Sequence, residues 1–323
     1  MLATVAIINY RTGGLTVDCL ASLEPEIARF EETIHVRVVD NDSGDDSPDQ
    51  IEQAIAERSW GDWCSLVRLP KNGGFAYGNN EAIRPFVDSG DPPRYVWLLN
   101  PDTVVRPNAL VELVRFLDAH PDVGIAGSRL EDPDGTPQRS AFRFPGVLSE
   151  FEAGTRLGPI TKLLRRFAIA PPVPVGDEPQ PADWMAGASL LVRREVFDQV
   201  GYMDEAYFMY FEEVAFCRET MRAGFERWYV PKSRVVHLVG QASGISGKVT
   251  KRMPTYWFDS RRRYFLTQLG TLRATLADAA WLTGFGLWRL RRRFQRKDDH
   301  DPQHLLADSF RHSVFRRGWR VSA

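Results

Sequence analysis

Three acidic residues stand where apolar runs of this chain end, and their positions suit metal chemistry. Asp102 follows the run "YVWLLN", and Asp40 and Asp42 follow the run "VRVV". Because Pro101 precedes Asp102, an ordinary turn is one explanation of the pattern. The other is that a buried strand delivers the carboxylate to a ligand, where it holds a hard divalent cation together with phosphate oxygens. Such an ion neutralises a leaving diphosphate.

A pair of glutamates, Glu212 and Glu213, begins a second segment of interest. Val214, Cys217 and Met221 recur behind the pair at helical spacing, so we expect a helix with a buried stripe. Acids at the start of a helix favour its dipole, which is a structural reason for having them there. The residues alone therefore leave the role of the pair open.

Alternating apolar patterns must form the elements that position these residues. Strand-like runs lie at 4–10, 35–42, 64–70 and 94–100, and helical spacing is found at 15–23, 48–58, 78–87 and 107–119. This alternation predicts an α/β fold with a mostly parallel, doubly wound, Rossmann-like sheet flanked by helices. Since the carboxyl ends of parallel strands share one edge, we expect the acids to converge there.

The later part of the chain has a looser pattern. Residues 130–182 are rich in Pro, Gly and Arg and predict an irregular surface loop. Ordered structure is expected again at 183–225, followed by strands at "RWYVP" and "RVVHLVG" and by a helical region beyond residue 250. No G-x-G-x-x-G follows the first strand, and no G-x-x-x-x-G-K-[ST] occurs, which disfavours nicotinamide-dependent and P-loop enzymes.

Length and composition are those of an ordinary globular protein. The 323 residues suffice for one large α/β domain with an appendage, and 43% of them are hydrophobic. Three widely spaced cysteines suggest neither a disulfide framework nor a zinc site. The chain opens without a basic leader and contains no apolar run of membrane-spanning length. We therefore expect a cytoplasmic protein. Whether it also binds peripherally to the inner face of the plasma membrane is left open by the sequence.

The charge of the chain is unevenly distributed. Residues 247–323 hold 17 Lys and Arg against 6 Asp and Glu, a local charge of +11, although the whole chain carries a formal charge of -1. Within this basic region Trp281, Phe285 and Trp288 recur at helical spacing, which favours insertion into an anionic membrane surface. A solvated helix that covers the catalytic domain is the alternative, and nucleic-acid binding is not expected.

Six segments carry a family resemblance. They are "VAIINY", "VVDNDSGD", "NGGFAYGNN", "LLNPDT", "WMAGASLLVRREVFDQVGYMDEAYFMYFEEVAFC" and "HLVGQASG". In this order, from about residue 3 to residue 244, they resemble the motifs of family 2 inverting glycosyltransferases. Within that family the chain is most similar to bacterial rhamnosyltransferases that extend polyprenyl-linked or polysaccharide acceptors. The resemblance implies a GT-A fold, a dTDP- or UDP-sugar donor and a Mg or Mn ion.

The resemblance also implies roles for residues on the donor side. It puts "NPD" in the place of the Asp-x-Asp motif, with Asp102 as the metal-binding acid and with the amide of Asn100 where the family often has Asp. It makes Asp40 the acceptor of a hydrogen bond from the imide N–H of uracil or thymine, which suits an acceptor-only group. The implied nucleotide-sugar-binding residues are Asn9, Asp40, Asn72, Gly73, Gly74, Asn80, Asn100 and Asp102.

On the acceptor side the resemblance implies a base and a binding loop. The acceptor hydroxyl loses a proton as it attacks the anomeric carbon, and a carboxylate can take that proton. The family's usual pair is Glu-Asp with Asp as the base, so Glu213 holds that position here and Glu212 is the alternative. His237 is implied as a further metal or diphosphate ligand, with a buried structural histidine as the alternative. Trp184 and Gly187 resemble the acceptor-binding loop, although a core role fits Trp184 as well.

Together these observations predict a metal-dependent inverting glycosyltransferase. Its expected reaction moves a sugar, first of all L-rhamnose from dTDP-rhamnose, to a hydroxyl of a glycan or polyprenyl-linked glycolipid. A transferase for another UDP- or dTDP-sugar and a noncatalytic glycan- or nucleotide-binding protein are the alternatives. We expect a catalytic domain at 1–246, with a nucleotide-sugar half to about 128 and an acceptor half from about 129, and a helical basic extension at 247–323. The sequence does not indicate an oligomeric state.

Overall fold

The computed structural model describes residues 1–174, 176–238 and 252–321, and within them a nine-stranded sheet forms the centre of the protein. The strand order is β3-β2-β1-β4-β10-β6-β11-β5, and β8 pairs with β11 outside this path. The strands are β1 (Ala3–Asn9), β2 (Ile34–Asp40), β3 (Cys64–Arg68), β4 (Tyr95–Leu99), β5 (Thr103–Val105), β6 (Val123–Glu131), β8 (Gln180–Pro181), β10 (Ser189–Arg193) and β11 (Glu226–His237). The α/β fold expected from the sequence is confirmed.

Most strands of this sheet run in one direction. Strands β1 to β4 pair in parallel, and β6 is parallel to β11. Strand β10 runs antiparallel between β4 and β6, with Ser189 opposite Leu99. The amino end of β10 therefore begins at the edge where β4 ends, which the alternating sequence pattern did not indicate. This reversal brings the segment before Ser189 to the same edge as the acids.

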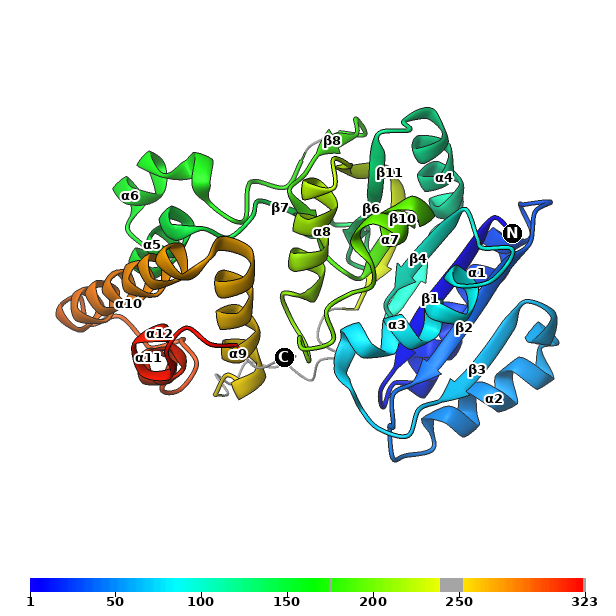
Figure 1. The fold of residues 1–323 in the computed structure, drawn as a ribbon, viewed down its shortest axis with the longest axis horizontal. Helices are drawn as coiled ribbons and strands as arrows, with labels where there is room; N and C mark the ends of the chain where they lie inside the picture. Colours follow the sequence, from blue (N-terminus) through cyan, green and yellow to red (C-terminus); the bar gives the residue numbers. More distant parts are fainter. Residues whose placement is uncertain (175, 239–251, 322–323) are drawn as a thin grey trace.

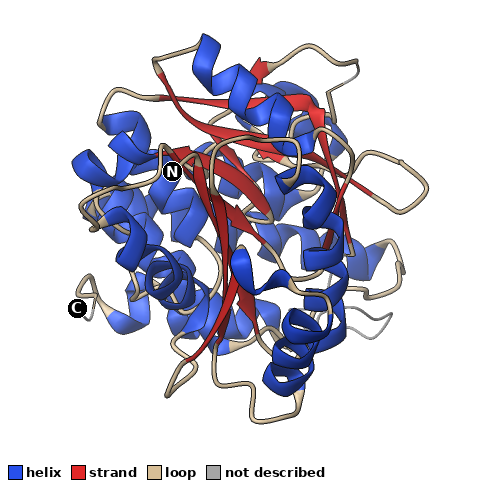
Figure 2. Ribbon diagram, turned by 90° about the vertical axis from the view of Figure 1, so that its right-hand side faces the viewer, coloured by secondary structure: helices blue, strands red, loops and turns tan. Residues whose placement is uncertain are grey.

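Helices cover both faces of the sheet, as Figure 2 shows with strands in red between helices in blue. On one face α1 (Gly13–Ile27), α2 (Ser47–Glu57) and α4 (Ala109–Ala119) pack on the sheet, and on the other α3 (Gly74–Val87), α7 (Arg194–Val200) and α8 (Glu212–Arg222). Strand β1 serves both layers, because Val5 and Ile7 belong to the first core while Ala6 and Ile8 belong to the second. Alternate side chains of a strand point to opposite faces, so one strand fills two cores.

Residues 130–182 are more ordered than the expected irregular loop. They contain β7 (Ala141–Phe142), α5 (Val147–Thr155) and α6 (Gly158–Leu163), and β7 pairs with β9 (Trp184–Met185). Helix α5 owes its packing to a distant helix, α10 (Thr271–Phe294), and to close contact between two glycines: a Cβ on Gly154 would lie 2.9 Å from the backbone of Phe285, and a Cβ on Gly284 3.0 Å from that of Phe151. Such a long-range contact leaves no local sequence signal.

The two strands expected at "RWYVP" and "RVVHLVG" are one strand, β11. Its pairing with β6 shifts register between Val230 and Arg234. Pro231 lies in this interval and has no N–H to donate, so the ladder is interrupted there without ending the strand. The strand then continues to His237 and pairs with β5 through Val235, Val236 and His237.

The C-terminal region is helical, as expected. It forms α9 (Thr255–Tyr264), a π-helical turn (Phe265–Leu269), α10, α11 (Leu305–His312) and α12 (Val314–Arg317). Figure 1 shows these elements together with α5 and α6 at the end of the molecule remote from β3. Tyr264, Phe265 and Ala277 join Val214 and Ala215 of α8 in a third core. The extension is thereby packed against the helix that begins with the glutamate pair.

One expectation for the extension is wrong. Phe285, expected to enter a membrane, is 1% exposed and packs against α5. Trp281 stacks on Phe285, with ring centroids 4.8 Å apart, and Trp288 donates its indole N–H to Asp301 at 3.2 Å. These aromatic side chains therefore face the protein. In the described part of the chain, no helix combines the length and the apolar character needed to cross a bilayer.

Candidate active site

A cavity of about 680 Å³ opens at the carboxyl edge of the sheet. Its lining comes from the ends of β1, β2, β4 and β11, the start of β10, the segment before α8, and helix α9. The lining residues predicted from the sequence are Asn72, Gly74, Asn100, Asp102, Gly187, Glu212, Glu213 and His237. The fold thus collects the metal-binding candidates and the candidate base around one space.

Asp102 and His237 meet at the wall of this cavity. The Nε2 atom of His237 lies 3.5 Å from Oδ1 of the largely buried Asp102. Two backbone contacts hold the pair in register: the N–H of Leu238 donates to the carbonyl of Asp102 at 3.0 Å, and Gln138 donates its side-chain amide to the carbonyl of His237 at 2.8 Å. His237 also faces Thr103 in the pairing of β11 with β5. The carboxylate and the imidazole are therefore neighbours because β5 returns antiparallel to β11.

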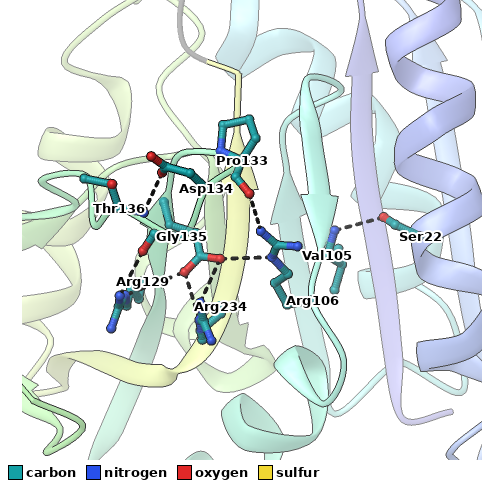
Figure 3. A network of polar contacts seen from close by, with 10 residues as sticks. Ser22, Val105, Arg106, Arg129, Pro133, Asp134, Gly135, Thr136 and Arg234 are labelled. Carbon is teal, nitrogen blue, oxygen red and sulfur yellow. Dashed lines mark hydrogen bonds and ion pairs between the residues drawn. The ribbon is translucent and has the colours of Figure 1, made fainter.

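A buried charge network links β5 and β11, and Figure 3 shows it from close by. Glu131, at the end of β6, is fully buried and accepts hydrogen bonds from Arg106 at 2.9 Å and from Arg234 at 2.8 and 3.1 Å. Burial by itself raises the pKa of Glu131, but the two arginines outweigh it and hold the pKa below its ordinary value. Arg106 follows β5 and Arg234 belongs to β11, so Glu131 joins these two strands. Asp102 directly precedes β5, and His237 ends β11.

The residues at this wall fit a divalent cation. Two ligands bound at about 2.1 Å to one ion lie about 3.0 to 3.5 Å apart, which matches the separation between Asp102 and His237. The Oδ1 atom of Asn100 is buried there and accepts no hydrogen bond from a described residue. No group of three or more His, Cys, Asp or Glu side chains suited to a metal occurs among the described residues. A cation here would therefore take its remaining ligands from a bound diphosphate or water.

The glutamate pair also lines the cavity, and the pKa values of both residues are raised. Burial, and then the neighbouring charge of Glu213, raises the pKa of Glu212 well above its ordinary value. Burial raises the pKa of Glu213 to about 7. The Oε2 atoms of both residues are buried and accept no hydrogen bond from the described protein. Burial therefore favours the protonated form of Glu212, whereas Glu213, with a pKa of about 7, is poised to lose and take up a proton.

The turn that presents the pair is strained and held by α9. Tyr210 and Phe211 both adopt left-handed conformations, with φ of 70° and 71°, which costs about 1 to 2 kcal/mol for each such residue. Ser260 of α9 donates its hydroxyl to the carbonyl of Met209 at 3.0 Å, and the ring of Phe211 packs on Tyr264 with centroids 5.5 Å apart. The extension thus supplies the contacts that keep the turn in place.

Comparisons with known proteins agree with this geometry. The family model described as "Glycosyl transferase family 2" matches residues 4–175, more than half of the chain. The chain belongs to this family. The GT-A fold and the expected membership are confirmed, and the protein is an inverting glycosyltransferase rather than a noncatalytic binding protein.

Relatives and solved structures give the likeness in more detail. An N-acetylglucosaminyl-diphospho-decaprenol L-rhamnosyltransferase of Mycobacterium tuberculosis is 30% identical over 254 residues, which cover 74% of this chain and 77% of the relative. The rhamnosyltransferase WbbL of Escherichia coli is 29% identical and covers 51% of this chain and 60% of that protein. A mannosyltransferase of Pyrobaculum calidifontis, solved with GDP-Man and Mn²⁺, has a TM-score of 0.56 at 15% identity and covers 91% of this chain and 74% of its own. The last likeness concerns the fold.

On the donor side of this glycosyltransferase a polar loop lines the cavity. Asn41 donates to Asn72 Oδ1 at 3.1 Å and to the carbonyl of Gly74 at 3.0 Å, and it accepts from the N–H of Gly73 at 3.2 Å. Gly74 has a φ of +88°, and a Cβ there would lie 2.0 Å from the carbonyl oxygen of Phe208. A side chain at position 74 would collide with Phe208, so glycine allows the segment before the glutamate pair to pack closely here. Its expected closeness to a donor stays a prediction.

Asp40 and Asn9 lie beneath the cavity surface and are not among its lining residues. Asp40 accepts from Asn9 at 2.6 Å and from Ser43 at 2.5 Å. The carbonyl oxygen of the Asn9 side chain accepts from Thr12 and Thr16. Asn9 is therefore a support for Asp40 in this structure. The expected hydrogen bond from Asp40 to a pyrimidine base remains a prediction.

Two further expected residues lie outside the cavity. Asn80 is fully buried. Its side-chain N–H group donates to the carbonyl of Met203 and to Glu205, and its side-chain oxygen accepts from the N–H of Met203. Asn80 therefore braces the loop before the glutamate pair. Trp184 stacks on Phe142, with centroids 4.2 Å apart, and donates its N–H to the carbonyl of Arg143. The packing role that fitted Trp184 from the sequence is the one observed, so a contact with the acceptor is not supported.

An aromatic wall lines the cavity and was not found from the sequence. Tyr256 of α9 packs between Phe208 and Tyr210, with centroid distances of 5.3 and 6.2 Å, and all three rings line the cavity. The aromatics of "FMYF" directly before the acid pair were a usable signal. Tyr256 had none, because it belongs to the extension and reaches the site only through the packing of α9.

Proposed function

We propose that this enzyme transfers L-rhamnose from dTDP-rhamnose to a hydroxyl of a polyprenyl-diphosphate-linked N-acetylglucosamine, with inversion at the anomeric carbon. The single observation that carries the mechanism is the common cavity of Asp102, His237 and the buried pair Glu212 and Glu213. The relatives named as rhamnosyltransferases support the choice of sugar, and the Mycobacterium tuberculosis relative supports the class of acceptor.

In the proposed reaction Glu213 accepts the proton of the acceptor hydroxyl. The hydroxyl oxygen forms a bond to the anomeric carbon while the bond from that carbon to the diphosphate oxygen breaks, and the electron pair leaves with dTDP. A pKa of about 7 leaves a substantial fraction of Glu213 ionised and still basic enough to take a proton. Burial and the neighbouring charge of Glu213 raise the pKa of Glu212, which favours its protonated form and makes Glu213 our choice for the base. Attack from the face opposite to the leaving group inverts the configuration.

On the donor side we propose that Asp102, His237 and the amide oxygen of Asn100 hold a Mg or Mn ion. Bound there, the ion would neutralise the charge of the leaving diphosphate. Asn41, Asn72 and the backbone at 73–74 would contact the nucleotide, and Asp40 would accept from the imide N–H of thymine or uracil. The same arrangement admits other UDP- or dTDP-sugars, so the donor must be decided by assay.

On the acceptor side we propose that the aromatic wall of Phe208, Tyr210 and Tyr256 receives the acceptor sugar. Pyranose rings present C–H groups that pack on aromatic faces, and these rings lie on the side of the cavity that also carries the base. Gly187 lines the same cavity, and a Cβ there would lie 3.6 Å from the Cβ of Glu213, in ordinary van der Waals contact. A lipid-linked acceptor would bring the enzyme to the inner face of the plasma membrane.

The test is a donor panel assayed with the full chain, a short-chain polyprenyl-diphosphate N-acetylglucosamine acceptor, and Mg²⁺ or Mn²⁺. We expect mass spectrometry to find the acceptor extended by one deoxyhexose with dTDP-rhamnose, and much less product with UDP-glucose, UDP-galactose or UDP-N-acetylglucosamine. Faster transfer from one of the other donors would replace the proposed sugar. No dependence on added cation after treatment with a chelator would contradict the proposed metal.

A further inference from the structure

Helix α10 carries an apolar stripe on the side away from the protein. The stripe consists of Leu272 (72% exposed), Leu276 (48%), Leu287 (52%), Leu290 (55%) and Phe294 (81%). At 100° per residue these positions fall within a narrow sector of the helix, whereas Trp281, Phe285 and Trp288 occupy the opposite sector. The aromatic face holds α10 to α5, so the apolar stripe stays at the surface of the described chain.

A tryptophan beside this stripe extends the exposed apolar surface. Trp319, which is also largely exposed, donates its indole N–H to Thr275 of α10 at 3.0 Å. Thr275 is next to Leu276, so the indole ring lies near the amino-terminal half of the apolar stripe. A tryptophan with one polar and one apolar end is typical of the boundary between water and lipid.

Arg273 and Arg293 flank the stripe on α10, and Arg296 follows the end of the helix. Arg273, Arg293 and Arg296 are exposed, and none of them forms an ion pair with a described carboxylate. Beyond Phe294 a cavity of about 400 Å³ is lined by Arg156, Trp288, Arg296, Lys297, Asp298, His300 and Asp301. The guanidinium of Arg156 pairs with Asp301, which leaves the cavity with an excess of positive charge. Because Trp288 lies in the sector opposite to the stripe, this cavity is not part of the apolar face.

We propose that α10 lies along the surface of an anionic phospholipid bilayer, with the apolar stripe inserted between the acyl chains and the bordering arginines at the headgroup phosphates. The inference rests on the proposed function in one respect. A lipid-linked acceptor gives the enzyme a reason to bind the bilayer, because the enzyme and its acceptor then share one surface. An apolar face with cations at its border binds bilayers by burying apolar area and by attracting anionic lipid. The local charge of +11 in residues 247–323 acts in the same direction.

The charge pattern favours a bilayer over a second copy of the chain. Two copies joined through the stripe would bring Arg273, Arg293 and Arg296 of each chain close to those of the other, and like charges within the Debye length of about 8 Å repel at physiological salt. An anionic bilayer offers the opposite charge along the whole helix. The surface is therefore complementary to lipid and not to itself.

The test is co-sedimentation of the full chain with vesicles of phosphatidylcholine and with equimolar phosphatidylcholine and phosphatidylglycerol. We expect stronger pelleting with the anionic vesicles, reduced but not abolished by high salt. The double variant Leu287→Gln/Leu290→Gln should lower partitioning about tenfold. Arg293→Gln/Arg296→Gln should lower it by about tenfold on the anionic vesicles alone. Leu148→Gln/Leu163→Gln, on exposed leucines of α5 and α6, is the matched control and should bind like the parent chain.

Two results would overturn the proposal. One is equal pelleting of the parent chain and Leu287→Gln/Leu290→Gln. The other is a dimer in light scattering that this variant converts to a monomer, which would assign the stripe to a second copy. Vesicle binding is measured without donor or acceptor, and transfer to a water-soluble acceptor should be the same in all variants. Failure of docking and failure of rhamnosyl transfer are thereby distinguished.

Discussion

The Nε2 atom of His237 lies 3.5 Å from Oδ1 of Asp102, although one residue follows β4 and the other ends β11. The antiparallel return of β5 along β11 creates this pair, and the buried Glu131 joins the two strands through Arg106 and Arg234. Such a pair has the spacing of two ligands of one cation. The first prediction follows from it.

Asp102→Asn should weaken cation-dependent nucleotide binding by about tenfold or more, because a neutral amide is a poorer ligand than a carboxylate. Calorimetry with dTDP and Mn²⁺ measures the effect. Asp42→Asn is the matched control: Asp42 follows β2 at the same edge of the sheet, is exposed and has a φ of 59° that Asn tolerates. Unchanged Mn²⁺-dependent affinity in Asp102→Asn would remove Asp102 from the metal site.

Glu213→Gln should lower kcat by about 10² to 10⁴ while leaving donor affinity nearly unchanged, because the amide cannot take the proton of the acceptor. Glu212→Gln should cost far less, since burial raises the pKa of Glu212 and so favours its protonated form, which Gln resembles. Steady-state kinetics at saturating donor compares the two variants. If the large loss appeared in Glu212→Gln instead, the roles of the two residues would be exchanged.

The pH dependence of kcat/KM should contain an ascending limb near pH 7. Burial raises the pKa of Glu213 from 4.5 to about 7, and only the carboxylate form accepts a proton, so the rate rises as pH increases through this value. Folding stability should respond in the opposite direction. Between pH 4.5 and 7 the native state binds this proton and the unfolded state does not, so the contribution of Glu213 to stability falls as pH rises.

Denaturant unfolding at pH 5 and pH 8 checks the sign of this linkage. The parent chain should lose more stability between the two pH values than Glu213→Gln, which has no proton to release at that position. An equal loss in both proteins would mean that Glu213 titrates near its ordinary pKa. The ascending limb of the rate profile should then lie well below pH 7.

Tyr256→Ala should raise the KM for the acceptor by about three- to tenfold, the range that loss of one aromatic contact costs. The KM for the donor should change little, because the ring belongs to the aromatic wall for which we propose the acceptor. Tyr256→Phe keeps the ring and is the control. Equal effects of both variants would point to the hydroxyl rather than to packing with the sugar.

Gly284→Ala should lower the free energy of unfolding by about 1 to 3 kcal/mol, because its Cβ would lie 3.0 Å from the carbonyl of Phe151 and 3.1 Å from the N–H of Thr155. Gly286→Ala, two residues further along α10, meets no atom within 4 Å. This control should stabilise the helix by about 0.5 to 1 kcal/mol. Thermal unfolding of the pair tests whether the α5–α10 contact holds the extension in place.

Local sequence determined the α/β layers and the position of the chemistry along the chain. Short apolar runs marked β1, β2, β3 and β4, and helical spacing marked the helices between them. Since parallel strands end at one edge, Asp102 could be assigned to that edge from its place after "YVWLLN" alone. The start of α8 at Glu212 followed in the same way from the apolar spacing behind it.

Tertiary structure decided which of the polar residues at that edge reach the cavity. Asp40 and Asn80 come from segments that were correctly assigned, yet Asp40 lies beneath the surface with Asn9, and Asn80 braces a distant loop. Hydrogen-bond partners decide the direction in which a side chain points, and those partners lie far away in the sequence. The contribution of Tyr256 depends on the docking of α9 for the same reason.

Helix α10 shows this division within one element. Its sequence carries apolar residues in two opposite sectors, aromatic in one and mostly leucine in the other, and basic residues along both. Periodicity predicts such a helix but cannot tell which sector is buried. The small residues Gly154 and Gly284 let the backbones of α5 and α10 approach on the aromatic side. That contact buries Phe285 and leaves the leucines at the surface.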